Sequence, residues 1–201
     1  MKKLLLLTFT LAAFTLYAQD INWGAKAGLN FASMTGDDAD GYDGRTSFHL
    51  GVTAEIEVSD VFSIQPELLF SGQGFTDSYS DPDFGDDTDI TGRVNYLNLP
   101  VMAKYYISDS FSLEAGPQIG FLMSAEVEEE GQIAFAPYSE EADIKDVLKS
   151  TDFALNLGAG YKLDSGLNFS LRYSIGMTDV PDGDSDGFKH SVLQLSVGYN
   201  F

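Results

Sequence analysis

The sequence has 201 residues and a formal net charge of −20, from 31 acidic and 11 basic residues. This excess of negative charge argues against nucleic acid, and against anionic lipid surfaces, as electrostatic partners. The chain has no cysteine, so disulfide bonds cannot stabilise it, although small exported domains usually depend on them.

Residues 1–18 predict a cleaved signal peptide, and residues 19–201 predict a single domain. Two lysines precede an apolar stretch at residues 4–16, which is too short to span a membrane comfortably, and Ala18 offers a small residue at the cleavage site. No later apolar run approaches the length of about 20 residues that a membrane-spanning helix needs. We therefore expect export from the cytoplasm without a transmembrane helix.

Apolar and polar residues alternate along most of the domain, which predicts strands with one apolar and one polar face. The pattern gives about eight segments of about 10–12 residues, the length that a tilted strand needs to cross a bilayer. In chain order the segments cover residues 21–31, 48–58, 62–70, 97–107, 111–123, 153–161, 167–177 and 191–201.

The connections between these segments alternate in length. Short turns follow the second, fourth and sixth segments, and long polar connections follow the others, at residues 34–46, 72–92, 124–150 and 178–189. Short turns at one end and long acidic extracellular loops at the other are typical of outer-membrane β-barrels. Because the number of strands is even, both termini are expected at the short-turn, periplasmic end.

The third long connection predicts a short amphipathic helix over the barrel mouth, at residues 139–150. Ser139 can cap this helix, and acidic residues fill its first turn. An apolar stripe follows at Ile144, Val147 and Leu148. We expect the helix to pack on its own loop rather than to bind a partner.

Aromatic residues on the apolar face form two belts. The belt near the short turns contains Trp23, Phe62, Tyr105, Phe111, Tyr161, Phe169 and Tyr199. The belt near the long loops contains Phe31, Phe48, Phe70, Phe121 and Phe153. Girdles at two interfaces indicate a transmembrane barrel, because strand propensity in a soluble core would not sort aromatic residues by depth.

The polar face is expected to line the lumen. Six of its charged residues fall at similar heights above the short turns and predict an ion-pair cluster: Lys26, Glu55, Glu67, Lys104, Glu114 and Arg172. An unpaired charge in a narrow lumen is costly, which favours mutual pairing. The cluster could form the charged constriction of a pore or a plug of packed side chains. We favour the plug, since side chains can fill the interior of an eight-stranded barrel.

The sequence ends on a strand, with Tyr199 and Phe201 on its apolar face. A terminal aromatic residue in register with that face predicts that the last strand closes the barrel against the first. We expect Phe201 to join the periplasmic girdle. With Tyr199 it is also expected to form the signal that the barrel-insertion machinery reads.

Several strands carry short motifs that are found together in one protein family. These are Gly28-Leu29-Asn30-Phe31, residues 96–106, Gly116-Pro117-Gln118-Ile119-Gly120, Asp152-Phe153 and Gly158-Ala159-Gly160-Tyr161. In these stretches the domain resembles the PorT-like outer-membrane β-barrel family of Gram-negative bacteria. The resemblance covers essentially the whole domain and implies the barrel fold. The namesake is an accessory of a protein-secretion system, but the motifs lie in strands rather than loops, so they do not carry that role over.

Most acidic residues lie in the long connections. Asp182, Asp184 and Asp186, with interspersed glycines, fit the first half of a calcium-binding loop. The twelfth position of such a loop falls on Leu193, which supplies no carboxylate, so a calcium site here is expected to be weak. The alternatives are a solvated acidic loop and divalent bridging to lipopolysaccharide. No other cofactor is expected.

Catalysis finds little support in the sequence. His49 and His190 are the two histidines, and nearby acidic and serine residues could imitate a hydrolase site. Isolated histidines among many acidic residues are more often incidental, and the sequence contains no phosphate-binding loop, paired-histidine motif or cysteine nucleophile. We therefore expect a protein that is not an enzyme.

Together these patterns predict an all-β, eight-stranded antiparallel transmembrane β-barrel in the outer membrane. The leading hypothesis is a monomeric, non-enzymatic barrel with a structural or binding role, of which an accessory role in secretion is one form. Its partners would be outer-membrane lipid, lipopolysaccharide and an unidentified surface protein. One alternative is a narrow channel for ions or small solutes. The other is a soluble, lipocalin-like periplasmic carrier with an apolar lumen.

Overall fold

The computed structural model describes residues 21–36, 43–81, 86–133, 136–181 and 188–201. Within these residues it has nine β-strands and one 3-10 helix. Their bounds are β1 Ile21–Thr35, β2 Asp43–Ser59, β3 Phe62–Asp81, β4 Asp86–Tyr106, β5 Phe111–Ile133, β6 Ala136–Asp143, η2 Lys145–Val147, β7 Thr151–Lys162, β8 Leu167–Gly176 and β9 Lys189–Asn200. No helix of the described part of the chain is long and apolar enough to cross a membrane.

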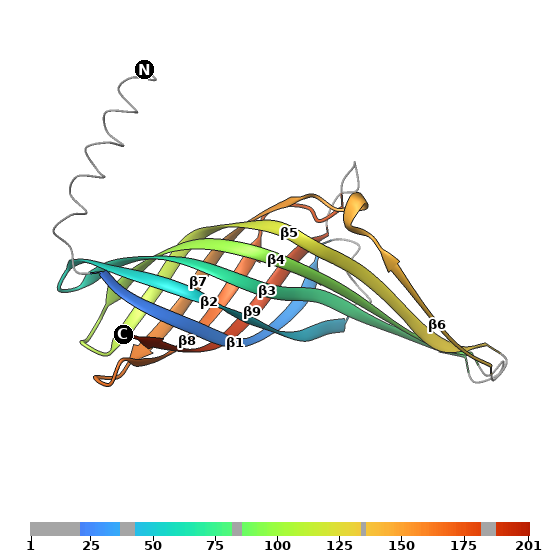
Figure 1. The fold of residues 1–201 in the computed structure, drawn as a ribbon, viewed down its shortest axis with the longest axis horizontal. Helices are drawn as coiled ribbons and strands as arrows, with labels where there is room; N and C mark the ends of the chain where they lie inside the picture. Colours follow the sequence, from blue (N-terminus) through green and yellow to red (C-terminus); the bar gives the residue numbers. More distant parts are fainter. Residues whose placement is uncertain (1–20, 37–42, 82–85, 134–135, 182–187) are drawn as a thin grey trace, which may run out of the picture.

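Eight of the strands form a closed antiparallel ring (Figure 1). Their order is β1-β2-β3-β4-β5-β7-β8-β9, and the pairing of β1 with β9 completes the circle. β6 lies outside the ring and pairs with β5. The predicted eight-stranded barrel is therefore confirmed. The start of β1 and the end of β9 lie at the same, short-turn end of the barrel (Figure 1).

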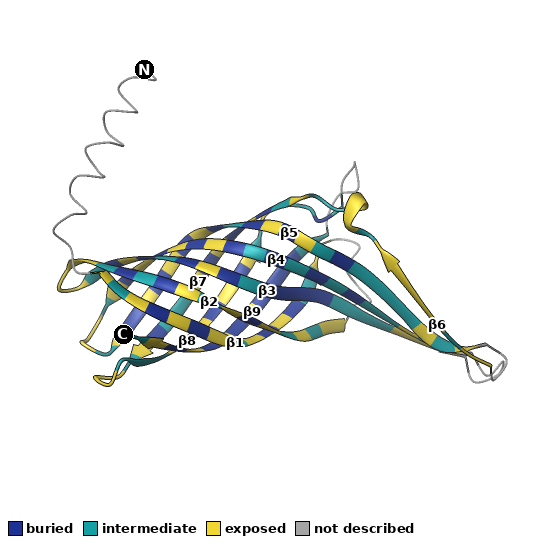
Figure 2. Ribbon diagram, in the orientation of Figure 1, coloured by how far each residue is buried: buried dark blue, intermediate teal, exposed yellow. Residues whose placement is uncertain are grey.

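The alternation of residue types determines which face of each strand is buried, as the striped strands of Figure 2 show. Most polar and charged side chains of the barrel point inward and are buried, whereas most leucine, valine and aromatic side chains point outward and are exposed. The exposed aromatic residues include Trp23, Tyr105, Tyr161, Phe31, Phe48 and Phe153. An apolar exterior around a polar interior is the arrangement of a barrel that lipid surrounds.

The strands extend much further than predicted at the long-loop end. Residues 72–81 belong to β3, residues 86–92 to β4 and residues 124–133 to β5, although all were expected in loops. Outside the membrane a strand needs no apolar face, so its sequence loses the alternation that reveals strands. The backbone ladders nevertheless continue, from Gly74 opposite Arg93 to Asp81 opposite Asp86.

The predicted helix at residues 139–150 is wrong. Residues 139–143 belong to β6, which pairs with β5 along its whole length. Only Lys145–Val147 is helical, as a single 3-10 turn. A short isolated helix is marginally stable, whereas pairing with the extended β5 satisfies the backbone of this segment at once.

A β-bulge marks the place where the barrel gives way to the extended strands. Asn95 pairs with Ser124 but Tyr96 pairs with Leu122, so Met123 is an extra residue on β5. A bulge bends a strand and increases its twist. Beyond it, residues 73–81, 86–95 and 124–133 continue with β6 as a four-stranded sheet that projects from the barrel (Figure 1). We call this the projecting sheet.

Candidate functional site

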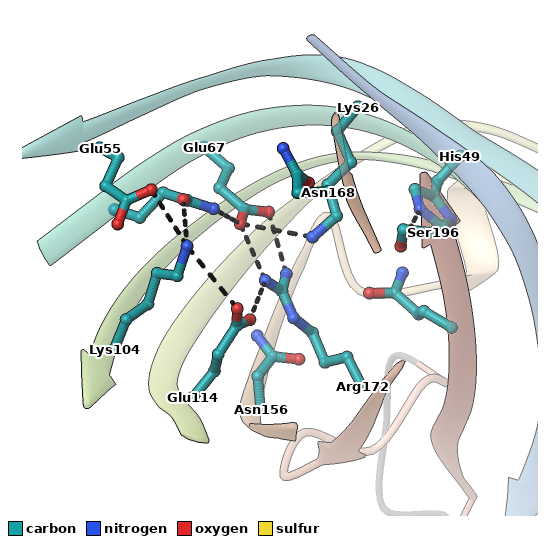
Figure 3. Close-up of polar contacts among 12 residues, drawn as sticks. Lys26, His49, Glu55, Glu67, Lys104, Glu114, Asn156, Asn168, Arg172 and Ser196 are labelled. Atoms are coloured by element: carbon teal, nitrogen blue, oxygen red, sulfur yellow. Dashed lines mark hydrogen bonds and ion pairs between the residues drawn. The ribbon is translucent and has the colours of Figure 1, made fainter. Parts of the chain in front are cut away.

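Six charged side chains from six strands meet in the lumen near the short-turn end (Figure 3). They are Lys26 of β1, Glu55 of β2, Glu67 of β3, Lys104 of β4, Glu114 of β5 and Arg172 of β8. All of them are buried. We call this set the ion-pair network; its members are the six residues that the sequence pattern singled out.

Arg172 is the centre of the ion-pair network and has no exposed side-chain surface. Its two terminal nitrogens donate to both carboxylate oxygens of Glu67, at 2.9 and 2.8 Å. One of them also donates to Glu114 at 3.3 Å. Lys26 Nζ lies 3.5 Å from Glu67. A paired, two-pronged contact of this kind is the strongest arrangement that arginine makes with a carboxylate.

The strand register explains how Arg172 reaches Glu114. Arg172 lies opposite Gly158, and Gly158 lies opposite Glu114. Because glycine has no side chain, the two charged groups meet across the intervening strand. Gly160 on the same strand makes room for the carboxylate, since a methyl group there would lie 2.6 Å from Glu114 Oε1.

Lys104 forms the second centre of the ion-pair network. Its Nζ donates to Glu55 Oε2 and to Gln65 Oε1, both at 3.1 Å, and lies 3.9 Å from Glu114. Tyr106 donates its hydroxyl to the other oxygen of Glu55. Sequence reasoning did not assign Gln65 and Tyr106 to the cluster, although the alternation had placed both on the polar face.

The charges of the ion-pair network cancel, with three cations facing three carboxylates. Taking a charge out of water costs several kcal/mol, and partners at hydrogen-bond distance offset that cost. The cavity beside Lys26, Lys104 and Glu114 has a volume of about 20 Å³, which is room for about one water molecule. The network therefore fills the barrel cross-section at this height.

A second polar layer lies around His49, on the long-loop side of the ion-pair network. The imidazole Nε2 lies 2.8 Å from Ser196 Oγ, and Nδ1 lies 2.7 Å from Asn30 Oδ1. Hydroxyl, imidazole and amide follow one another as in a hydrolase triad, but all three residues are buried. Asn30 also binds Ser71 and accepts from Gln194, so this cluster ties β1, β2, β3 and β9 together. Asn30 and Ser196 were not singled out from the sequence.

The second histidine lies in a different setting. His190 is buried and packs edge-on against Tyr96, with ring centroids 5.8 Å apart. Tyr96 in turn belongs to a buried apolar cluster with Val94, Leu122 and Ala125, against which Ile144 and Leu148 pack. Leu148 pairs with Pro181, and Lys149 N–H donates to the carbonyl of Val180 at 2.9 Å. These contacts cap the long-loop end of the lumen.

The projecting sheet carries carboxylates on both faces. Four of them form two directly opposed pairs on one face, Glu126 with Asp143 and Glu128 with Glu141. On the other face Glu129 opposes Glu140. Directly opposed like charges destabilise a strand pair. Arg93 forms an ion pair with Glu128.

Near its tip the projecting sheet has an open hollow of about 570 Å³, lined by Tyr79, Asp87, Asp89, Glu130 and Tyr138 among others. Tyr138 leans over Gly131, lies 3.0 Å from the hydroxyl of Thr88 and donates to Glu129 at 2.7 Å. The hydrogen bond with Thr88 lowers the pKa of Tyr138, but the hydrogen bond to Glu129, desolvation and the negative charges of Glu129 and Glu140 together outweigh it, so the pKa is raised.

The remaining predicted site residues have separate positions. Asp182, Asp184 and Asp186 lie outside the described residues, and the described part of the chain holds no group of three or more side chains that could bind a metal ion. Tyr199 points outward from β9, and Phe201 N–H donates to the carbonyl of Trp23 on β1 at 2.9 Å. Their role as an insertion signal stays a prediction.

Solved structures similar to this chain include several bacterial proteins. Ail, the attachment invasion locus protein of Yersinia pestis, is 13% identical with a TM-score of 0.48, over 90% of this chain and 99% of that chain. Neisserial surface protein A is 8% identical with a TM-score of 0.47, over 89% and 97%. OprG of Pseudomonas aeruginosa is 14% identical with a TM-score of 0.44, over 91% and 97%.

No curated protein sequence matches the chain significantly. A family model for the outer membrane protein beta-barrel domain, however, matches residues 17–182. The matched segment contains most of the barrel strands and the whole ion-pair network. This chain therefore belongs to the outer membrane protein beta-barrel domain family and is a β-barrel protein of the outer membrane.

Proposed function

We propose that this protein is a non-conducting, non-enzymatic scaffold that anchors the projecting sheet in the outer membrane and presents it to a protein partner at the cell surface. In this proposal the long-loop end faces the outside and both termini face the periplasm. Short turns on the periplasmic side and long extensions on the outer side are the usual arrangement of such barrels, which supports this orientation.

The observation that carries the proposal is the filled lumen. The ion-pair network occupies one height, the His49 cluster a second and the apolar cap around Tyr96 a third. Ions would have to break the contacts of Arg172 with Glu67, which are fully desolvated, to pass. A channel for ions or small solutes is therefore the weaker candidate.

The polar lumen also weighs against the lipocalin-like carrier. Such a carrier needs an apolar interior for its cargo. Here the inward-facing side chains of the barrel are mainly charged, amide or hydroxyl groups, and most of the large apolar side chains are on the outside. The exterior suits lipid and the interior offers little space for a ligand.

A role as an accessory to protein secretion is one specific form of this proposal. A scaffold with a rigid, projecting binding element can hold other components of an assembly at the membrane. The strand motifs shared with the PorT-like family do not carry this role, so it rests on the projecting sheet, and loss of secreted surface proteins after deletion of the gene would support it.

A planar lipid bilayer tests the non-conducting part of the proposal. The folded protein is expected to show no discrete openings over a range of applied voltages. A variant with Arg172→Ala and Lys104→Ala, which empties both centres of the ion-pair network, is the positive control for a leak. Discrete openings of the unaltered protein would overturn the scaffold proposal and favour the channel.

An epitope tag inserted between Asp81 and Asp86 tests the orientation. Antibody should label this tag on intact cells, whereas a tag inserted between Asp164 and Ser165, in a short turn, should become accessible only after the outer membrane is opened. The reverse pattern would overturn the proposed orientation.

A weak calcium site at Asp182, Asp184 and Asp186 remains a further proposal, together with divalent bridging to lipopolysaccharide. It rests on the alternating carboxylates of that segment. Calcium titration of the folded protein by calorimetry tests it, with the triple aspartate-to-asparagine variant as the control. Absence of heat at millimolar calcium would remove both ideas.

A further inference from the structure

We propose that the outer edge of β6 binds an extended, basic protein segment, which adds to the projecting sheet as another strand. This inference rests on the proposed function and names the chemistry of the partner. The partner class follows from two independent features of β6: the direction of its backbone groups and the charge around them.

β6 is an edge strand. Within the described residues its ladder runs along β5 alone, from Glu126 opposite Asp143 to Ile133 opposite Ala136. A strand at the edge of a sheet presents a row of unpaired N–H and C=O groups that another chain can pair with. At 8 residues, β6 is long enough for a segment of ordinary strand length.

The direction of the β6 backbone groups follows from one hydrogen bond. Ile144, the residue after β6 and its Asp143, donates its N–H to the carbonyl of Ala125 on β5 at 3.0 Å. Successive residues of a strand direct their N–H and C=O groups to opposite sides. Tyr138 and Glu140 therefore face β5, whereas Ser139 and Glu141 face the open edge.

Pro137 agrees with this assignment. Pro137 is two residues before Ser139 and four before Glu141, so its backbone nitrogen points to the same open side. The N–H that proline lacks would therefore face the open edge, and the β5–β6 ladder loses no donor. Proline in a sheet is largely confined to such edge positions. The open donors of β6 are therefore Ser139, Glu141 and Asp143, and the open acceptors also include the carbonyl of Pro137.

The side chains beside this edge determine which segment fits. Glu140 lies on one face of β6, and Glu141 and Asp143 lie on the other. All three are exposed. A strand added here would place its side chains next to carboxylates on both faces, so basic residues on both of its faces are favoured over apolar or acidic ones.

The carboxylates gain from a cationic partner because the sheet does not neutralise them itself. Arg93 of β4 lies opposite Glu126 and forms an ion pair with Glu128, but it is one cation beside the two opposed carboxylate pairs of that face. On the other face Glu129 opposes Glu140. Protection of an edge strand from aggregation needs only a single charge on that edge, so it does not account for opposed pairs of carboxylates. These pairs reduce the stability of the sheet, and a bound basic strand would relieve their repulsion.

The same charges argue against a second copy of this chain as the occupant. Two β6 edges would bring Glu140 and Glu141 of one copy against the same carboxylates of the other. Repulsion of this kind is a means by which sheets avoid pairing edge to edge. A basic segment from a different protein meets no such barrier.

The test uses the folded full-length protein in lipid nanodiscs and a synthetic peptide that repeats the unit Lys-Lys-Thr over the length of β6. Binding is measured by fluorescence anisotropy at low salt. The peptide should bind saturably. A peptide of the same sequence with alternate backbone amides N-methylated keeps its charge but cannot form a ladder, and should bind at least about tenfold more weakly.

Two variants locate the site. Ser139→Pro removes an outward donor without touching the β5 ladder, and should weaken binding about fivefold or more. Glu140→Gln with Glu141→Gln should weaken it by about five- to tenfold. Asp60→Asn with Asp109→Asn, at the short-turn end, removes the same charge and should leave binding within about twofold of the unaltered protein.

Each other outcome overturns the inference. Equal binding of the N-methylated peptide would show simple charge attraction without strand pairing, and absence of binding would show that the edge is merely protected. Self-association of the protein through β6 would make a second copy the occupant. The proposed function is judged separately, because bilayer conductance and tag accessibility do not depend on the peptide.

Discussion

Arg172 holds Glu67 through two hydrogen bonds of 2.9 and 2.8 Å, at a point in the lumen where neither side chain has any exposed surface. The two residues are 105 positions apart in the sequence and lie on β8 and β3. The same guanidinium also reaches Glu114. One side chain therefore links three strands across the barrel, and its loss should affect both stability and the filling of the lumen.

Replacing Arg172 with methionine should destabilise the barrel by about 3–5 kcal/mol, because Glu67 and Glu114 would be left as uncompensated buried carboxylates. Urea unfolding in phospholipid vesicles can measure this, with fluorescence of the single tryptophan, Trp23, as the signal. Lys189→Met is the control. Lys189 Nζ lies 4.0 Å from Asp179, and both side chains are partly exposed, so its loss should cost less than about 1 kcal/mol.

Adding Glu67→Gln to Arg172→Met should restore part of the lost stability. The double variant removes one cation and one anion, which leaves the other members of the network balanced, with Lys104 still beside Glu114. Residues of one ion-pair network are coupled, so the double variant should be less unstable than the sum of the single ones by about 0.5–3 kcal/mol. Additive losses would show that the two side chains act independently.

Much of the barrel could be predicted because lipid constrains the sequence within the membrane. A residue such as Leu195 must face lipid and its neighbour Gln194 the lumen, so residue type alone reports the direction of each side chain. The six members of the ion-pair network followed from that rule and from counting along the strands. The individual pairs did not, because they depend on the stagger between strands that are distant in the sequence.

The projecting sheet could not be predicted for the same reason. Beyond Met123, β5 carries carboxylates on both of its faces, with Glu128 and Glu129 at adjacent positions, so it has no apolar face. The pattern then resembles a loop, although pairing with β4 and β6 satisfies the backbone. These residues lack apolar alternation because of the environment around them, and not because they lack strand structure.

Gly160→Ala should weaken the ion-pair network without changing its charge. The added methyl group would lie 2.6 Å from Glu114 Oε1 and 2.8 Å from Ser112 Oγ, so the carboxylate has to shift from the position in which its Oε2 accepts from Arg172. Overpacking of this kind typically costs about 1–3 kcal/mol. In the same unfolding assay Gly44→Ala is the control, since its methyl group would meet only the carbonyl oxygen of Ala32, at 3.1 Å, within close range. Equal losses for the two variants would contradict the role given to Gly160.

Salt should stabilise the hairpin of β5 and β6 selectively. The opposed pairs Glu126 with Asp143 and Glu129 with Glu140 are repulsive, and the screening length falls from about 30 Å at 0.01 M salt to about 3 Å at 1 M. Hydrogen exchange should therefore slow at the Glu140 amide, which faces β5, as salt increases. The amide of Leu195, in the lipid-facing part of β9, is the internal control and should change little. Arg93→Gln should strengthen the effect, because it removes the cationic partner of Glu128. If exchange at Glu140 were independent of salt in both proteins, the opposed carboxylates would not be repelling each other, and the electrostatic argument for a basic partner at β6 would fail with them.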